Sequence, residues 1–158
     1  MKETELKIRV LGDPVLRQVT KTVVKVTESH RKALSEMARL MYSVSGVGLA
    51  ATQVALLDSM FVADIGTGLY KLINPEIIES KGSQVNEEGC LSVPGVGIKV
   101  KRAKNIVLKA LNENGIPLVL EAEDLLACVF QHEIDHLNGK LIVDYASMLD
   151  KIKLRKNL

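Results

Sequence analysis

The sequence predicts an α+β fold in which mainly antiparallel strands wrap around a buried central helix. Short runs of aliphatic residues recur between residues 60 and 120 and are separated by Gly, Asn and Pro, as is typical of antiparallel strands joined by turns. Residues 121–138 then carry apolar side chains around most of a helical circumference, which indicates a helix buried on nearly every side. An N-terminal helix and a short C-terminal helix complete the predicted fold.

Length and composition favour one domain over residues 1–158, because a chain of 158 residues can form a single core and shows no linker or repeat. The net charge of +2 gives no indication of nucleic-acid binding. No apolar run approaches the roughly 20 residues of a membrane span, and the charged start Met-Lys-Glu-Thr-Glu does not suit a signal peptide. We therefore expect a cytoplasmic protein with no membrane contact and no sequence-specific nucleic-acid partner.

The first half of the chain contains the N-terminal helix and three strands. Residues 6–11 alternate as a short strand does and end at a Gly-Asp-Pro turn. Residues 27–42 favour a helix with Thr27 as its N-cap. Its apolar stripe consists of Leu34, Met37, Ala38 and Met41. Residues 60–65 and 69–73 form a hairpin, after which Asn74 and Pro75 are expected to interrupt the chain before a further strand toward residue 85.

The second half is expected to contain a loop, three strands and the two remaining helices. Residues 87–95 favour a loop because Gly and Pro bound it. Strands follow at 96–100, 105–111 and 116–120, with an Asn-Gly reversal before the last one. After the central helix we expect a short strand at 140–145 and a basic C-terminal helix at 146–158.

The central helix carries a metal-binding pattern. His132 and His136 are four residues apart and so project from one helical face, close enough to bind a single ion. Glu133 lies beside them, where a free carboxylate can take a proton from an attacking water. The alternative is that two histidines fell at this spacing by chance on an ordinary helix.

A catalytic metal usually takes three protein ligands, so a third ligand is expected outside this pair. Cys128 lies on the same helical face, but it is eight residues from His136 and therefore about 12 Å from it along the axis, too far to share one ion. Cys90 has no such limit, because its Gly-containing segment can fold onto the helix. Its other interpretation is a small buried apolar residue.

Three segments resemble the signature motifs of one enzyme family, the peptide deformylases. They are Gly-Val-Gly-Leu-Ala-Ala-Thr-Gln at 46–53, Glu-Gly-Cys-Leu-Ser at 88–92 and Gln-His-Glu-Ile-Asp-His at 131–136. Each matches at every specified position, in the family's order and at about its spacing. On its own, the first segment is equally well read as a tight turn. Together the three segments make a chance match improbable.

The resemblance implies a ligand set and a reaction. Cys90, His132 and His136 would hold one divalent metal ion, with Fe²⁺ as the native ion and Zn²⁺, Ni²⁺ or Co²⁺ as substitutes. Glu133 would act as general base, while the Gln53 side chain and the Leu91 backbone N–H would stabilise the oxyanion. The reaction implied is removal of the formyl group from the formyl-methionine of newly made polypeptides, with release of formate.

The resemblance also implies a substrate pocket. Its apolar walls would be Val47, Leu125, Cys128 and Val129. Gly48 and Gly89 would offer backbone groups to the extended substrate. Among the supporting residues, we expect Arg102 to pair with Asp135 in the mostly apolar helix and Glu88 to orient a ligand histidine.

Two features depart from the family pattern. Gly97 stands where many members carry a basic residue that meets the substrate backbone, and Lys99 is a candidate replacement. The C-terminal tail is also shorter than in members that dock on the ribosome. We still expect transient contact with the ribosome through the basic residues of this tail, which are Lys151, Lys153, Arg155 and Lys156. The alternative is that these residues form an ordinary solvated surface.

Two other functions fit the helix motif alone. A zinc endopeptidase shares the two histidines and the glutamate, but would use a third His or a Glu in place of a thiolate. A metal-binding module without turnover would need a fourth protein ligand, and the sequence offers only three.

Overall fold

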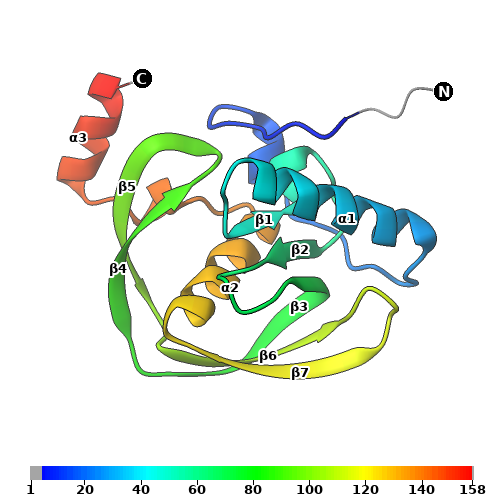
Figure 1. Cartoon of the computed structure of the whole chain (residues 1–158). Coiled ribbons are helices and arrows are strands. Elements are labelled where there is room, and N and C mark those ends of the chain that lie inside the picture. Colours follow the sequence, from blue (N-terminus) through cyan, green and yellow to red (C-terminus); the bar gives the residue numbers. More distant parts are fainter. Residues whose placement is uncertain (1–4, 158) are drawn as a thin grey trace.

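The computed structural model describes residues 5–157 as two antiparallel sheets and three α-helices, and this confirms the α+β class (Figure 1). Residues 1–4 and 158 lie outside the described part, so most of the charged start and the final residue of the predicted C-terminal helix go without a structural account. No described helix has the length and apolarity that crossing a membrane requires.

The larger sheet has five strands in the order β1-β2-β3-β6-β7, each antiparallel to its neighbour. Their bounds are β1 Gly48–Ala50, β2 Met60–Ala63, β3 Tyr70–Lys81, β6 Asn105–Leu111 and β7 Pro117–Glu123. β1 is one edge of this sheet, and Gly48 pairs with Ala63 there. The first signature segment, residues 46–53, therefore includes this edge strand and most of the 3₁₀ helix Ala51–Val54 that follows it.

The second sheet is a hairpin of β4, Gln84–Cys90, and β5, Val93–Arg102. β3 leads directly into β4, so the chain passes from the large sheet to the hairpin at one corner of the molecule (Figure 1). Cys90 ends β4 opposite Val93, next to the turn of the hairpin. The second signature segment is thus carried on a strand end.

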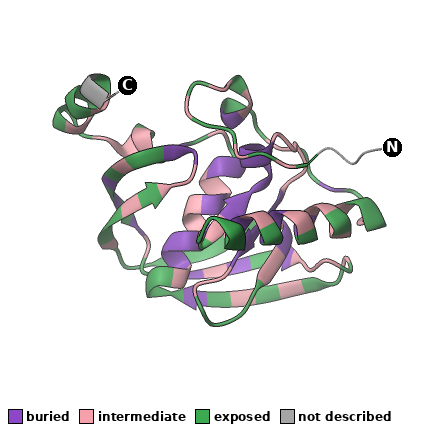
Figure 2. Cartoon of the chain, turned by 45° about the horizontal axis from the view of Figure 1, so that its top comes forward, coloured by how far each residue is buried: buried purple, intermediate pink, exposed green. Residues whose placement is uncertain are grey.

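The three α-helices are α1, Glu28–Ser43; α2, Asp124–Leu137; and α3, Met148–Asn157. The predicted N-cap of α1 is confirmed, because Thr27 is extended and forms a capping box with His30. In α2 every residue from Leu126 to Leu137 is buried or half-buried, and Figure 2 shows buried residues gathered in α2 and the strands beside it.

Phe130 anchors α2 in the core. Its side chain is fully buried, and its ring lies 5.6 Å from that of Phe61 and 5.1 Å from that of Tyr70, measured between centroids. These two partners come from β2 and β3. Aromatic pairs at such distances add to the stabilisation from apolar burial, so the contact fixes α2 against the large sheet.

Two strands were predicted where none exists. Residues 6–10 have no regular structure and Leu11 begins a turn. The Arg9 N–H donates to Gln53 O and the Leu11 N–H to Ser92 O, so the segment contacts two different partners and joins neither sheet. Residues 142–145 form a 3₁₀ helix, whose Asp144 accepts from the Leu141 N–H and from Arg17.

Two segments predicted to be irregular are parts of strands. Residues 87–90 belong to β4, because Gly89 and its polar neighbours pair with β5 across the hairpin. β3 continues through Asn74 and Pro75 by means of an irregularity in its pairing with β6. Asn74 adopts a left-handed φ of 53°, and its side chain bonds both the N–H and the C=O of Val23.

Replacing Phe130 by Ala is expected to lower the free energy of unfolding by about 3–5 kcal/mol, because it removes a buried ring and leaves a cavity between α2 and the large sheet. Urea unfolding of the metal-free protein measures this loss. Val119→Ala on β7 is the control, because Val119 is 64% exposed and its truncation should change stability by less than about 0.5 kcal/mol. Equal effects of the two substitutions would refute the anchoring role.

Candidate metal centre

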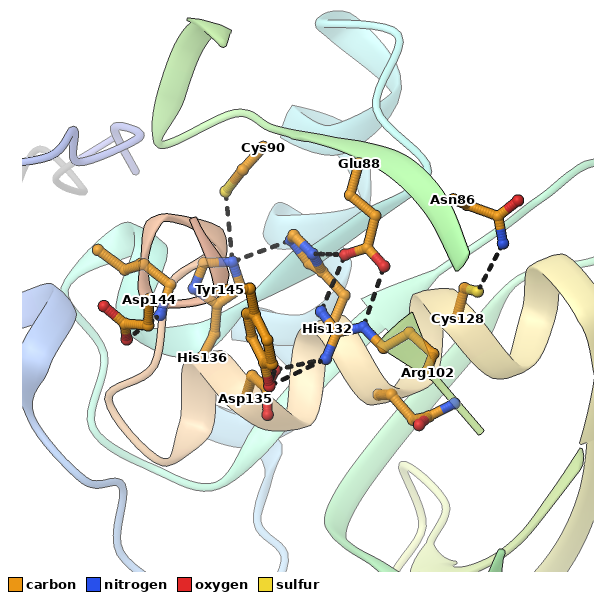
Figure 3. Close-up of polar contacts among 12 residues, drawn as sticks. Asn86, Glu88, Cys90, Arg102, Cys128, His132, Asp135, His136, Asp144 and Tyr145 are labelled. Atoms are coloured by element: carbon orange, nitrogen blue, oxygen red, sulfur yellow. Dashed lines mark hydrogen bonds and ion pairs between the residues drawn. The ribbon is translucent and has the colours of Figure 1, made fainter. Parts of the chain in front are cut away.

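Three potential metal donors converge at the middle of the molecule. The ligand atoms of Cys90, His132 and His136 all lie within 4.8 Å of one another. The Cys90 Sγ is 3.3 Å from the His136 Nε2, which is 3.1 Å from the His132 Nε2 (Figure 3). Cys128 is not part of this group, in agreement with the helical distance argument.

The two elements that supply these donors are held together by a neighbouring glutamine. Gln131, directly before His132, donates to the Ala103 C=O and accepts from the Ala103 N–H. Ala103 directly follows β5, so this pair of hydrogen bonds fixes α2 to the open end of the hairpin, while Cys90 lies at its turn end. No signal in the sequence gave Gln131 a role beyond its place in the motif.

A network of charged residues lies behind the histidines. The Arg102 Nε and Nη2 donate to the two carboxylate oxygens of Glu88 at 3.0 and 2.8 Å, and its Nη1 donates to Asp135 Oδ2 at 2.5 Å. Glu88 Oε1 is also 3.0 Å from the His132 Nδ1. The predicted Arg102–Asp135 pair and the predicted contact of Glu88 with a motif histidine are both confirmed.

Tyr145 is a further member of this network that the sequence analysis missed. Its hydroxyl donates to Asp135 Oδ2 at 2.6 Å, and its ring centroid lies 4.9 Å from the Arg102 guanidinium carbon. No motif marks Tyr145, because only the folded chain brings residues 102, 135 and 145 together.

The network fixes the ionisation of its members. Burial raises the pKa of Glu88, but Arg102 and His132 outweigh this and hold it below the ordinary value of 4.5. Burial also lowers the pKa of Arg102, and the carboxylates of Glu88 and Asp135 more than reverse this. Glu88 is therefore an anion at neutral pH and keeps the His132 ring oriented, with its Nε2 toward Cys90 and His136.

The two histidines differ in protonation. Burial lowers the pKa of His132, but Glu133, Cys90 and Glu88 raise it to about 10. Burial, followed by the charge on His132, places the pKa of His136 well below 6.5. One thiol and two imidazoles thus converge within reach of one another, and this is a donor set that a divalent cation can bind.

Glu133 is the second buried carboxylate of the site. It is 3% exposed, and its Oε1 is one of two buried side-chain polar atoms without a partner among the described residues; the other is the His136 Nδ1. Burial raises the pKa of Glu133 to about 7. A buried group of this kind, poised near neutral pH, suits proton transfer.

The residues predicted to stabilise an oxyanion lie beside the donors. The Gln53 side chain is 1% exposed, and its Oε1 accepts from the Ala50 N–H at 2.9 Å. This contact turns its Nε2 toward Ser92 Oγ at 3.1 Å and Cys90 Sγ at 3.7 Å. Leu91 lines the same cavity.

An open cavity of about 540 Å³ lies in front of these groups. All six residues predicted to bind substrate line it: Val47, Gly48, Gly89, Leu125, Cys128 and Val129. Asn86 and Glu87 line it too, and the sequence analysis missed both. For Asn86 the signal was the alternation of strand side chains, which places it on the same face of β4 as Glu88, whereas no such signal marks Glu87.

The cavity has no lysine or arginine in the part of its lining that the structure describes. At Gly97 a Cβ atom would come within 2.6 Å of Glu87 Oε1, so Glu87 occupies the space that a side chain at position 97 would need. Lys99 pairs with Glu87 across the hairpin but does not line the cavity, so the structure gives no support to its role as a replacement.

The fold and site define a metal-dependent hydrolase, because a Cys/His/His donor group adjoins a buried carboxylate in an open cavity. Residues 5–152 match the family model of polypeptide deformylase. The chain belongs to the peptide deformylase family, whose members remove the N-terminal formyl group from newly made polypeptides.

Relatives and solved structures agree over most of the chain. It is 50% identical over 140 residues to a peptide deformylase of Carboxydothermus hydrogenoformans, covering 89% of this chain and 92% of the relative. The crystal structure of the Thermotoga maritima enzyme is 46% identical, with a TM-score of 0.88 over 92% of this chain and 99% of that one. The Synechococcus elongatus enzyme, solved in complex with actinonin, is 38% identical, with a TM-score of 0.93 over 99% and 87% of the two chains.

Replacing Glu88 by Gln is expected to destabilise the metal-free protein by about 3–5 kcal/mol at pH 7, because it leaves the buried Arg102 short of one partner. The folded-state pKa of Glu88 lies below 4.5, so its contribution is present above pH 4.5 and is lost as the pH falls through the folded-state value. The difference between wild type and variant should therefore shrink in acid. Urea unfolding between pH 3 and pH 7 measures it.

The matched control for this experiment is Glu76→Gln. Glu76 pairs with Lys109 on the surface, where the two side chains are 64% and 54% exposed, and such pairs contribute little. A Glu88→Gln difference that stays the same at pH 3 and pH 7 would show that ionised Glu88 does not stabilise the fold.

Replacing Gly48 by Ala is expected to reduce kcat/KM by about tenfold to 100-fold, because the added methyl group would overlap the Glu133 carboxylate and displace it. The free energy of unfolding and the metal content should change little, since β1 pairs through its backbone. Steady-state kinetics with a formylated peptide tests this, and a variant as active as the wild type would contradict the tight placement of Glu133.

Proposed function

We propose that this chain hydrolyses the formyl group of N-terminal formyl-methionine with a divalent metal ion held by Cys90, His132 and His136, and releases formate. The observation that carries this proposal is the convergence of these three donors beside the buried, unpartnered Oε1 of Glu133. Three protein donors leave a position open for the reacting groups, whereas a structural site is closed by four.

The donor chemistry supports a first-row transition metal. One thiolate and two imidazoles suit Fe²⁺, Zn²⁺, Co²⁺ and Ni²⁺, and disfavour Mg²⁺ and Ca²⁺, which prefer oxygen. We infer Fe²⁺ as the native ion, with the other three as substitutes. When bound, the ion would supply Lewis acidity, which eases deprotonation of water and polarises the formyl carbonyl.

Glu133 serves as the general base. Its carboxylate lies in the cavity wall next to His132, and its raised pKa of about 7 lets it accept a proton from the attacking water near neutral pH. The same carboxyl group then returns the proton to the leaving nitrogen. Because Glu133 is buried, its proton exchanges little with bulk water and passes from the attacking water to the leaving nitrogen.

Gln53 and Leu91 stabilise the negative charge that develops on the formyl oxygen. The Gln53 Nε2 is directed toward Cys90 and Ser92, and the Ala50 N–H fixes this orientation by binding the amide oxygen. The Leu91 backbone N–H is the second donor. Two preoriented neutral donors stabilise an oxyanion without adding charge to the ground state.

The substrate chain is held between two strand edges. β1 and β4 each pair with one neighbour among the described strands, and Gly48 and Gly89 from these edges line the cavity. Their backbone groups can bind an extended peptide as an added strand. The methionine side chain then enters the pocket formed by Val47, Leu125, Cys128 and Val129.

Several wider features accompany this function. We infer that α2 is the central buried helix around which the strands wrap and that residues 1–158 form one domain. A cytoplasmic location follows from a substrate made by the ribosome. Exposed Lys151, Lys153 and Arg155 on α3 support transient ribosome contact.

The site also bears on the two other candidate functions. A zinc endopeptidase with this helix motif takes a third His or a Glu as metal ligand, whereas the third donor here is the thiol of Cys90. A metal-binding module without turnover has no use for Glu133, whose buried Oε1 lacks a partner. Both observations favour deformylation.

Replacing Glu133 by Gln is expected to keep one metal ion per chain and to lower kcat by about 100-fold to 10⁴-fold, because the amide cannot accept the proton. Anaerobic formate release from a formyl-Met peptide by the iron-loaded protein measures this. The acetylated peptide should not react.

The matched control is Glu87→Gln, the same change on an exposed carboxylate of the same cavity, and it should leave turnover of the same order as the wild type. Cleavage of internal peptide bonds, or no reaction at full metal occupancy, would refute the proposed function.

A further inference from the structure

One wall of the substrate cavity is polar. Asn86 on β4 and Cys128 on α2 both line the cavity, and the Asn86 Nδ2 donates to Cys128 Sγ at 3.6 Å (Figure 3). The other walls predicted for the methionine side chain are the aliphatic residues Val47, Leu125 and Val129. An amide is thus placed among groups that offer only apolar contact.

The orientation of this amide is fixed by its neighbours. The Gln84 Nε2 donates to the C=O groups of Ala103 and Asp124, which turns the Gln84 Oε1 toward Asn86. The Gln84 Oε1 accepts from the Asn86 Nδ2 at 3.2 Å, so the amide nitrogen of Asn86, and not its oxygen, faces Cys128. The wall therefore presents an N–H donor.

This donor lies where the end of the first side chain is expected. Cys128 is one turn before His132 on α2, which separates the two by about 6 Å along the axis, close to the length of an extended methionine side chain. A side chain that starts beside the metal donors and runs along α2 therefore ends near Asn86 and Cys128.

The present partner of the Asn86 N–H is a weak one. A thiol sulfur is a poor hydrogen-bond acceptor, so a stronger acceptor that enters the pocket can replace it. Burial raises the pKa of the Cys128 thiol, which keeps its own S–H as an additional weak donor. A fully apolar pocket would instead leave an entering acceptor unpaired, at a cost in binding free energy.

We propose that Asn86 is a specificity-determining residue that lets this enzyme deformylate substrates whose first side chain carries a hydrogen-bond acceptor near its end, in particular formyl-methionine sulfoxide. The sulfoxide oxygen accepts the hydrogen bond that the Asn86 N–H otherwise donates to the Cys128 Sγ. The inference rests on the proposed function of the site and deepens it, because it extends the substrate class to oxidised N-termini.

The test compares three formyl tripeptides that differ only in the first residue: methionine, norleucine and methionine sulfoxide, with the sulfoxide epimers assayed separately. Norleucine has the same length but no acceptor. In the wild type the ratio of kcat/KM for the better epimer to kcat/KM for norleucine should exceed the ratio in Asn86→Leu by about tenfold or more, as expected for loss of one hydrogen bond to a buried acceptor. Asn86 is exposed on β4, so the variant should fold.

The matched control is Asn105→Leu, the same change on an exposed strand residue of β6 that does not line this cavity. It should leave the ratio of kcat/KM for the sulfoxide peptide to kcat/KM for the norleucine peptide as in the wild type. Equal ratios in the wild type and Asn86→Leu overturn the inference while formyl-methionine is still hydrolysed. Failure of every formyl peptide instead overturns the proposed function itself.

A second measurement reads the hydrogen bond directly. In the zinc-loaded protein, the side-chain amide resonance of Asn86 should shift on addition of the unformylated product peptide that begins with methionine sulfoxide. The norleucine product should move it much less. Identical shifts with both peptides overturn the inference, because they would mean that the amide does not distinguish the acceptor.

Discussion

The buried guanidinium of Arg102 makes the contact on which the active site depends. It binds Glu88 on β4 through two N–H groups and Asp135 on α2 through a third. A charge with only 6% exposure must keep such partners, since leaving it unpaired is costly. Because the partners belong to different elements, Arg102 ties the hairpin to the helix, and Cys90 is thereby held against the two histidines.

The pKa values of two carboxylates of the site shift in opposite directions because their surroundings differ. Glu88 faces Arg102 and the His132 Nδ1, so it stays an anion at neutral pH and orients the His132 ring. Glu133 is buried with one oxygen unpartnered, and its pKa rises to about 7. The first is suited to permanent support and the second to proton transfer. Gly48 maintains this division, because any Cβ there would displace Glu133.

The cavity combines an apolar pocket with a small number of directed polar groups. Aliphatic side chains of α2 and the first signature segment provide its walls, and the edges of β1 and β4 provide backbone groups. Apart from Cys90 and His132, the polar side chains that line it are those of Ser45, Gln53, Asn86 and the glutamates. Such a pocket favours an extended neutral peptide terminus.

The sequence by itself determined the features that depend on local spacing. The pair His132 and His136, the bounds of α1 and α2 to within a few residues, and the exclusion of Cys128 as a ligand all follow from helical geometry. The family also followed from the sequence, because its three motifs are continuous segments. Cys90 was only a candidate for the third metal ligand until the family resemblance was considered. Local sequence does not determine which loop packs against a helix.

The tertiary structure alone decided which distant segments meet. Residues 87–90 form a strand despite Gly89 because β5 lies beside them, whereas residues 6–11 alternate like a strand but meet two unrelated partners. Tyr145 and Asn86 belong to the site although neither lies in a signature motif. Their places depend on packing between elements far apart in the chain, and periodicity within a segment carries no information about such contacts.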